Sequence, residues 1–577
     1  MSNTPNFDLK IKTILNATKP GERVCALSGR KWDMTEEELG WYKKFNVPPS
    51  DLHPETRRRL LFGFPSGVAI WWKPHAETGK PILSFVHPDS PFQVITDKEW
   101  AVAEFLDKGF EVNLQKSFFD QFKQLAFSVP VGNLRADPKD INTISVDTLE
   151  VSDSYMTFGN WDLKRVQYQT IGYHIEDSTD LTNTNIARNC YTMNRVNKMY
   201  NCKYAFESRD CINCSFIFDC RNCEFCFGAT NKRNRKYLWW NEQLSEDEWK
   251  KKISETNLSC YPNLQNTINK FYDIFDGAVW PENFYIGSEE CNGEYIEEST
   301  RCFNAYWSDK AVDTYECSMA VEHRDSAFSV WIGWGSNTYY SADQVKGENI
   351  KFCARCWYSS NMEYSIDCHN CEYCFGCAGL KRKQFYIFNK QYKQEEYWQK
   401  VDELKCAMLD RGEYGEFLPA ALSESGLQFS MGNMYAQYSD EELKMFDAPT
   451  FDPKTANIVM PSSGVGNCLI SDDLPDCLVD VDETKYVGVP IYDKEIQRSY
   501  SITKQEFKFY QDHQLPLPRR HFLTRLENTI RHSNSPLPYQ VECGECGKMI
   551  TAYKNATFPN KVVNCNECYL KYLEQKG

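Results

Sequence analysis

Four cysteines near the C-terminus have the spacing of a metal site. They form two Cys-x-x-Cys pairs, Cys543 with Cys546 and Cys565 with Cys568, on either side of residues 547–564. Two such pairs can place four thiolates around one tetrahedral ion, as in a zinc ribbon. Four sulfurs complete the coordination shell and leave no position for substrate, so the sequence predicts a structural zinc site rather than a catalytic one.

A second run of cysteines lies in the middle of the chain, where Cys368, Cys371, Cys374 and Cys377 follow one another at every third position. This spacing is similar to an iron–sulfur ligand run, although the ferredoxin pattern has a longer last interval and then a proline. A sister copy of the stretch has Ala229 in place of the fourth cysteine. A metal cluster would not tolerate that loss, whereas a wall of small buried thiols would. Buried packing is therefore favoured, and zinc and iron–sulfur sites stay open as alternatives.

Basic residues suggest a further kind of contact. Arg519, Arg520 and Arg525, together with basic segments at 232–236 and 381–383, could bind nucleic-acid phosphate. Solvated turns and helix faces also explain such runs. The net charge of −15 and a pI near 5.3 argue against a large nucleic-acid footprint. RNA or ribosome binding is kept as an alternative function.

The sequence contains no motif of a common enzyme class. It has no Gly-x-Gly-x-x-Gly or Walker loop, no Gly-x-Ser-x-Gly elbow and no His-Glu-x-x-His metal motif. Catalytic residues need not be close in sequence, so enzymatic activity stays open. We favour a protein that is not an enzyme, and a metal or redox enzyme that uses the central cysteines is the second alternative.

The central cysteines belong to a duplicated stretch, since residues 219–249 and 367–397 align without a gap. Asn-Cys and Asp-Cys pairs recur around the first copy: Asn189-Cys190, Asn201-Cys202, Asp210-Cys211 and Asn213-Cys214. Short β-prone pieces with small residues at recurring positions are typical of a β-solenoid, in which each coil stacks on the last. We predict such a domain over 151–410, with repeats at about 187–252 and 335–402.

A weaker repeat brackets the chain. Its matching residues are Tyr42, Pro48, His53, Thr56 and Arg57 in the first copy and Tyr510, Pro516, His521, Thr524 and Arg525 in the second. In the first copy, Cys25-x-x-Ser28 and His53-x-x-Thr56 outline a ribbon that lacks half of its ligands. Two ligands cannot hold zinc firmly, so we expect a degenerate, metal-free ribbon module.

The overall composition completes the predicted domain organisation. The 577 residues are 42% hydrophobic and 14% aromatic, which predicts several packed domains. The chain shows no secretory signal and no membrane span, so we expect a cytoplasmic protein whose 25 cysteines are reduced. The predicted segments are a degenerate ribbon module (1–62), a small α+β domain (63–150), the solenoid-like domain (151–410), an acidic connector (411–500) and a helix with the zinc ribbon (501–577).

Taken together, these features resemble a family of cysteine-rich zinc-ribbon proteins common in candidate-phyla bacteria. The resemblance rests on the helices at 42–57 and 510–525, Thr78-Gly79-Lys80-Pro81-Ile82, Phe118 to Phe122, Cys371 to Cys377 with Asn389, and the terminal ribbon. The family has a Cys-Pro-x-Cys-Arg knuckle where this chain has His53-Pro54-Glu55-Thr56-Arg57. The family implies zinc ribbons and supplies no activity. A CaiB/BaiF (type III CoA-transferase) label is common among its members, and no residue of this sequence supports it.

The sequence thus predicts a mainly β protein with α+β flanking parts, a central cysteine-rich β-solenoid and a C-terminal zinc ribbon. Its expected role is that of a zinc-containing scaffold that binds a protein partner. Exposed end coils of a solenoid need capping or pairing, so a homo-oligomer is a further expectation.

Overall fold

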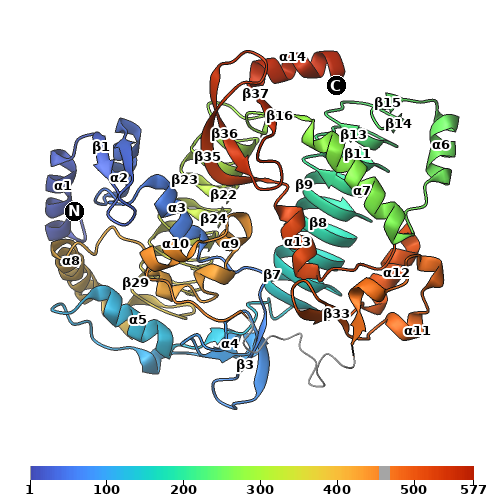
Figure 1. Cartoon of the computed structure of the whole chain (residues 1–577). Helices are drawn as coiled ribbons and strands as arrows, with labels where there is room; N and C mark the ends of the chain where they lie inside the picture. The colour runs from blue at the N-terminus through green and yellow to red at the C-terminus, as the bar shows by residue number, and fades with distance from the viewer. Residues whose placement is uncertain (1, 454–467) are drawn as a thin grey trace. The chain divides into compact units, whose positions relative to one another are not determined.

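The computed structural model describes residues 2–453 and 468–577 of a mixed α/β chain with large parallel sheets (Figure 1). The chain divides into two compact units. Unit 1 contains Met1–Asn133 and Phe284–Ala456, and unit 2 contains Leu134–Asn283 and Asn457–Gly577. Each unit therefore combines a stack of parallel strands with flanking elements from a distant part of the chain.

Unit 2 is built on a stack of parallel strands, which we call the unit 2 ladder (Figure 1). Its strands are β7 (Ile144–Ser152), β8 (Tyr155–Arg188), β9 (Tyr191–Tyr200), β10 (Lys203–Phe206), β11 (Arg209–Ile212), β12 (Ser215–Phe218) and β13 (Phe227–Thr230). Tyr191 pairs with Lys203, Lys203 with Ser215 and Ser215 with Phe227. The chain thus advances by one rung every 12 residues. The antiparallel hairpin β14 (Leu238–Trp239) and β15 (Glu242–Gln243) ends the stack.

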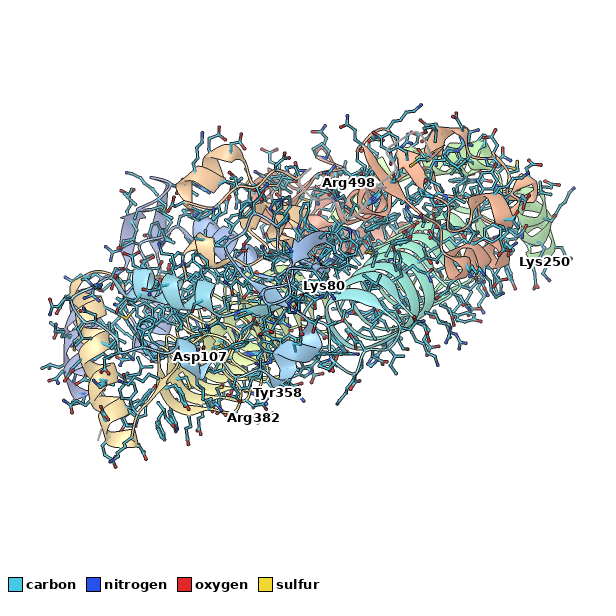
Figure 2. The ribbon with its side chains drawn as sticks, turned by 90° about the horizontal axis from the view of Figure 1, so that it is seen from below. Lys80, Asp107, Lys250, Tyr358, Arg382 and Arg498 are labelled. Atoms are coloured by element: carbon cyan, nitrogen blue, oxygen red, sulfur yellow. A yellow bond between two sulfur atoms is a disulfide. The ribbon has the colours of Figure 1, made fainter. Side chains whose placement is uncertain are left out.

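Unit 1 contains a second stack with the same advance, the unit 1 ladder, which forms two parallel sheets. The strands of one are β17 (Tyr285–Ile286), β18 (Gly293–Glu297), β20 (Ala305–Asp309), β22 (Ser318–Val321), β24 (Val330–Gly333) and β26 (Ala342–Val345). Those of the other are β19 (Thr300–Phe303), β21 (Val312–Tyr315), β23 (Arg324–Ala327), β25 (Ser336–Tyr339), β27 (Glu348–Lys351), β28 (Ser360–Glu363), β29 (Glu372–Phe375), β30 (Gln384–Ile387) and the antiparallel β31 (Lys390–Gln391). Tyr358 and Arg382 lie beside these strands in Figure 2.

A three-residue unit explains the ladder sequence. Every third backbone position adopts positive φ, as at Asn201 (48°) and Asn213 (53°), a conformation that asparagine tolerates better than most residues. The residue that follows points inward, and Cys202 and Cys214 are fully buried. Small side chains such as these pack closely in the buried cluster of the ladder. The recurring Asn-Cys pairs therefore combine a turn residue with a core residue.

Helices and short hairpins flank the unit 1 ladder. In chain order they are α1 (Pro5–Ala17), β1 (Gly21–Val24), β2 (Lys31–Met34), α2 (Glu36–Phe45), α3 (Pro54–Phe62), β3 (Trp71–Pro74), β4 (Pro81–Ser84), β5 (Val94–Ile95), α4 (Asp97–Val102), η1 (Leu106–Lys108), α5 (Phe118–Ser128), β6 (Val131–Gly132), α8 (Gln394–Asp410), η2 (Ala420–Leu422), η3 (Leu427–Phe429), α9 (Met431–Tyr435) and α10 (Asp440–Met445). Helix α5 is amphipathic and buries Phe118, Phe122 and Leu125 on one face.

The flanking elements of unit 2 come from both sides of its ladder in sequence. They are α6 (Glu246–Glu255), α7 (Tyr261–Asp276), β16 (Val279–Pro281), β32 (Leu469–Ile470), η5 (Ser471–Asp473), η6 (Leu478–Asp480), α11 (Glu483–Tyr486), β33 (Ile491–Asp493), β34 (Arg498–Tyr500), α12 (Lys504–His513), α13 (Phe522–Ile530), β35 (Asn534–Glu542), β36 (Met549–Asn555), β37 (Val562–Asn564) and α14 (Asn566–Lys576). Helix α13 packs on β8, and α7 packs on β12 and β13.

The two predicted repeats of segment 151–410 lie in different units. Helices α6 and α7 separate the two ladders in sequence, and each ladder gathers its own flanking elements. Short helices and strands occupy much of the predicted connector at 411–500, of which residues 454–467 lie outside the described part of the chain. No helix among the described residues is long and apolar enough to cross a membrane.

Candidate metal centre

The C-terminal cysteines come together at the meeting point of a hairpin and a helix. Cys543 and Cys546 lie in the turn between β35 and β36, and Cys565 and Cys568 lie at the start of α14. All four sulfurs are within 4.8 Å of one another. Cys546 is exposed and the other three are buried, so the cluster lies just beneath the surface.

The local sequence shapes this turn. The backbone N–H of Cys543 donates to the Lys548 carbonyl at 2.8 Å, and the N–H of Gly547 donates back to the Cys543 carbonyl at 3.0 Å. Gly547 has a φ of 73°, which glycine adopts at no steric cost. A Cβ at Gly544 would lie 2.8 Å from the Val562 side chain, so glycine is required there for the hairpin to approach β37.

The surroundings of Cys543 favour its thiolate form, whereas sulfur contact with Cys565 and burial raise the pKa of Cys568. Burial raises the pKa of Cys543, but hydrogen bonds from the backbone N–H groups of Cys546, Cys565 and Glu545 outweigh it and lower that pKa to about 6. One of these donors, the N–H of Cys565, lies 3.3 Å from the Cys543 sulfur. Backbone amides that stabilise thiolates are a common feature of metal–sulfur sites.

The spacing of the sulfurs fits one tetrahedral ion. Metal–sulfur bonds of about 2.3 Å place tetrahedral sulfurs about 3.8 Å apart. The sulfurs of Cys546 and Cys565 are 3.9 Å apart. The group can therefore hold one metal ion with four thiolates, and such a shell has no open position for a substrate.

The metal centre is fastened to the rest of unit 2 on both sides. Strand β37 pairs in parallel with β16, and the Tyr569 hydroxyl contacts the carboxylate of Asp219, a buried residue of the ladder. Arg233 donates to both oxygens of the same carboxylate at 3.0 and 2.9 Å. Closing the metal centre therefore also holds the Tyr569 hydroxyl against the ion pair of Asp219 and Arg233.

The predicted central cluster has a different geometry. Cys368, Cys371, Cys374 and Cys377 lie inside the unit 1 ladder, and each thiol donates to a backbone carbonyl, Cys371 to those of His369 and Leu380 at 3.4 Å. Burial raises the pKa of Cys368 and Cys374 well above its ordinary value, which keeps these thiols protonated. Among residues 2–453 and 468–577, the C-terminal four are the one group of metal-binding side chains that gathers within ligand distance.

The three candidate nucleic-acid arginines have intramolecular partners. Arg519 forms an ion pair with Asp476 at 2.5 Å, Arg520 with Asp472 at 2.9 Å, and Arg525 with Asp180 at 2.6 Å. The Arg525 side chain is only 12% exposed. Contact with phosphate would therefore have to compete with these carboxylates.

The degenerate N-terminal module brings three of its four predicted residues into contact. The Cys25 sulfur lies 3.8 Å from the Thr56 hydroxyl, which in turn lies 3.4 Å from the Ser28 hydroxyl. The side chain of His53 accepts the N–H of Glu55 at 3.1 Å and so begins α3. Burial opposes ionisation of Cys25, yet backbone N–H groups and the Ser28 hydroxyl lower its pKa to about 7.

The structure also reveals why Tyr42, Arg57 and their counterparts recur. The Arg57 guanidinium is buried and donates to the Tyr42 hydroxyl at 2.8 Å, to Glu38 at 3.2 Å and to Glu316 of the ladder at 2.7 Å. In unit 2, Arg525 contacts Tyr510 at 3.1 Å, Glu506 at 3.5 Å and Asp180 of the ladder at 2.6 Å. Each cluster joins its helices to a ladder. The sequence repeat pointed to the Tyr and Arg residues but not to their ladder partners.

The expectation that all 25 cysteines are reduced is wrong for one pair. Cys260 and Cys477 form a disulfide that joins the start of α7 to the segment before η6. Neither cysteine belongs to a Cys-x-x-Cys pair, so no spacing signal could connect them.

No protein-family model matches this chain, and no curated protein sequence matches it.

Proposed function

We propose that this protein is a non-enzymatic scaffold, stabilised by one structural zinc ion, that presents rigid surfaces to a protein partner. The carrying observation is the closed group of four cysteine sulfurs at 543, 546, 565 and 568. Four sulfurs at tetrahedral spacing are the preferred environment of structural zinc.

Each ladder has the features of a β-solenoid. The parallel register advances by 12 residues per rung, and inward side chains such as Cys214, Cys226, Ala320 and Cys374 are fully buried. Stacked coils bury their interior by contact with neighbouring coils, which produces a stiff, extended body. Such bodies are commonly used as interaction surfaces, because their outer side chains are held at fixed spacing.

The thiols of Cys368 and Cys377 in the unit 1 ladder support a scaffold over the redox alternative. A redox centre requires thiolates, whereas burial raises the pKa of Cys368 and Cys377. Their sulfurs also donate to carbonyls of the ladder itself, Cys377 to Phe375 and Tyr386 at 3.5 Å each. These contacts are those expected of cysteines that pack in a protein core.

The RNA alternative has less support than the scaffold. Besides the three arginines, the basic segments are engaged within the chain: Arg233 pairs with Asp219 at 2.9 Å, and Lys383 with Glu104 at 2.8 Å. A cytoplasmic location remains part of the proposal.

The test is purification of the full chain from its native source under mild conditions, followed by sizing at low and high salt. The proposal predicts a stoichiometric protein complex that survives high salt, and no substrate turnover by the pure protein. A complex that dissociates on ribonuclease treatment or with a steep salt dependence would favour RNA binding. Substrate-dependent turnover by the purified chain would contradict the proposal.

A further inference from the structure

Three other segments repeat the hairpin-and-helix geometry of the metal centre. We infer that the chain contains four ribbon-type modules, two in each unit, and that three of them are closed by direct polar contacts where the fourth uses cysteine sulfur. We call them module A (21–62), module B (71–102), module C (491–530) and module D (534–576). The inference goes beyond the proposed function and rests on it only in taking module D as the zinc-binding reference.

The hairpin turns of the four modules share two features, and three of the modules share a third. We call the positions that match the four cysteines of module D the first to fourth ligand positions. The first ligand position directly follows the first strand or is its last residue, and it is occupied by Cys25, His75, Asp493 and Cys543 in modules A to D. Four residues later the backbone is left-handed, with φ of 67° at Gly29, 68° at Gly79, 55° at Gln497 and 73° at Gly547. In modules A, B and D, the first-position N–H donates to the carbonyl five residues on, at 2.8 Å (Arg30), 2.9 Å (Lys80) and 2.8 Å (Lys548).

The second half of each module also corresponds. A helix begins immediately after the third ligand position, which is His53, Thr96, His521 or Cys565. In modules A, B and D, the same backbone hydrogen bond ties the hairpin turn to the residue two positions before that helix cap: Ala26 to Asp51 at 2.9 Å, Ala76 to Val94 at 2.8 Å and Gly544 to Val563 at 2.9 Å. Because the same backbone hydrogen bond recurs in three modules, chance similarity is a poor explanation for their shared hairpin-and-helix geometry.

Modules C and D share one more contact. The N–H of the helix cap donates to the side chain at the first ligand position, from His521 to the Asp493 carboxylate at 2.8 Å and from Cys565 to the Cys543 sulfur at 3.3 Å. The Asp493 carboxylate in module C therefore occupies the place that the Cys543 sulfur occupies in module D.

In each of modules A, B and C, polar contacts join the hairpin to the start of the helix. In module A, the Cys25 thiol, Thr56 hydroxyl and Ser28 hydroxyl form a chain of contacts at 3.8 and 3.4 Å. In module B, His75 Nε2 lies 2.8 Å from a carboxylate oxygen of Glu99, which occupies the fourth ligand position. In module C, the Asp493 carboxylate accepts the N–H groups of both His521 and Glu495. Because these bonds join the same two elements as the metal would, the modules need no ion to close.

The modules also occur as two equivalent tandem pairs. Modules A and C each precede a partner and each carry the buried Glu-Tyr-Arg cluster. Modules B and D follow, and each adds its strand in parallel to a strand from another part of its unit, β5 to β6 and β37 to β16. The two units are therefore built from the same parts, a ladder and a tandem pair of modules.

The first experiment compares hydrogen exchange of the intact wild-type protein before and after removal of metal by a chelator. The inference predicts that amides of module D exchange at least tenfold faster after chelation, while those of modules A, B and C do not change. Faster exchange in any of these three modules on metal removal would overturn the inference. An unchanged module D together with a metal-free preparation would instead contradict the proposed zinc site.

The second experiment introduces a four-cysteine metal site into module A. Its result tests the inference independently of metal binding by module D. Ser28→Cys, His53→Cys and Thr56→Cys are combined, so that module A has four cysteines with Cys25. The expected zinc content rises by about one ion per chain over that of the wild type. The matched control adds Cys25→Ser to the same triple variant, and its gain is expected to be lost.

A folded variant that gains no metal would overturn the inference. If the module A variant does not fold, the same test is made in module B with His75→Cys, Thr78→Cys, Thr96→Cys and Glu99→Cys. Cobalt absorption from tetrahedral thiolate coordination provides an independent readout, and its absence from both folded and cobalt-loaded variants would count equally against the inference.

Discussion

At the scale of single residues, buried polar groups decide how the flanking helices attach to the ladders. Arg57 is one of the largest fully buried side chains, and its guanidinium is shared between Glu38, Tyr42 and Glu316. Burial opposes the charge of Arg57, but the carboxylates of Glu316 and Glu38 outweigh it and raise its pKa well above its ordinary value. Such a cluster gives little net stability, yet removing one member leaves a buried charge without its partner.

Arg57→Ala is therefore expected to destabilise unit 1 by about 3–5 kcal/mol, because Glu38 and Glu316 would remain buried without a counter-charge. The measurement is the urea midpoint of the transition of unit 1. Arg30→Ala is the matched control, since Arg30 is 50% exposed and pairs with Glu55 at the surface. A loss below about 1 kcal/mol, as expected for that control, would contradict the role given to Arg57.

His532 gives unit 2 a dependence on pH. Burial among Phe206, Tyr272 and Phe558 lowers its pKa to about 4, well below that of an unfolded histidine. Between these two values the unfolded chain binds a proton that the folded protein does not, so stability is complete above about pH 6.5 and falls as the pH decreases toward 4.

We expect the wild type to lose about 2 kcal/mol more than His532→Gln when the pH is lowered from 7 to 5. The comparison is made by urea unfolding of both proteins at each pH, so that other titrating groups cancel. Equal losses in both proteins would show that His532 does not titrate in this way.

At the scale of elements, the ladders explain which features could be predicted from sequence. Asn201-Cys202 and Asn213-Cys214 were visible as pairs because each residue type has a physical task, a left-handed backbone or a small inward side chain. The prediction placed the two repeats in one domain, whereas the structure places them in different units. Helices α6 and α7 separate the two ladders in sequence, and no local pattern shows that a ladder recruits elements hundreds of residues away.

The candidate metal centre was the most predictable part, because its ligands lie in two short pairs and the structure brings all four together. Module B escaped detection because its ligand positions hold His75, Thr78, Thr96 and Glu99, which have no metal-site signature. The partners of Arg57 and Arg525 were also hidden, because Glu316 and Asp180 come from the ladders and lie far away in sequence.

Cysteines inside the ladders should tolerate small side chains and resist large ones. Cys377→Ala is expected to cost about 1 kcal/mol and to leave metal content unchanged, since Ala229 already occupies the equivalent place in the other repeat. Cys377→Leu overfills a fully buried position and should cost at least about 2 kcal/mol. Urea unfolding and elemental analysis of both variants provide the check, and loss of a metal ion from Cys377→Ala would reopen the central cluster as a site.

At the scale of the whole molecule, the two units differ in their metal-binding side chains. Unit 2 contains four cysteine sulfurs in one group, whereas no such group gathers among the described residues of unit 1. Metal loss should therefore act on unit 2 alone. It would release β37 and Tyr569 and so disturb the ion pair of Asp219 with Arg233.

Zinc X-ray absorption of the purified protein, combined with elemental analysis, tests the central claim most directly. The account predicts about one zinc ion per chain, with four sulfur ligands at about 2.3 Å and no nitrogen or oxygen in the shell. Cys546→Ser should lose most of this metal, whereas Cys406→Ser, at a free cysteine outside the group, should keep it. Stoichiometric iron, or a zinc ion with an open or mixed shell, would contradict a closed structural site.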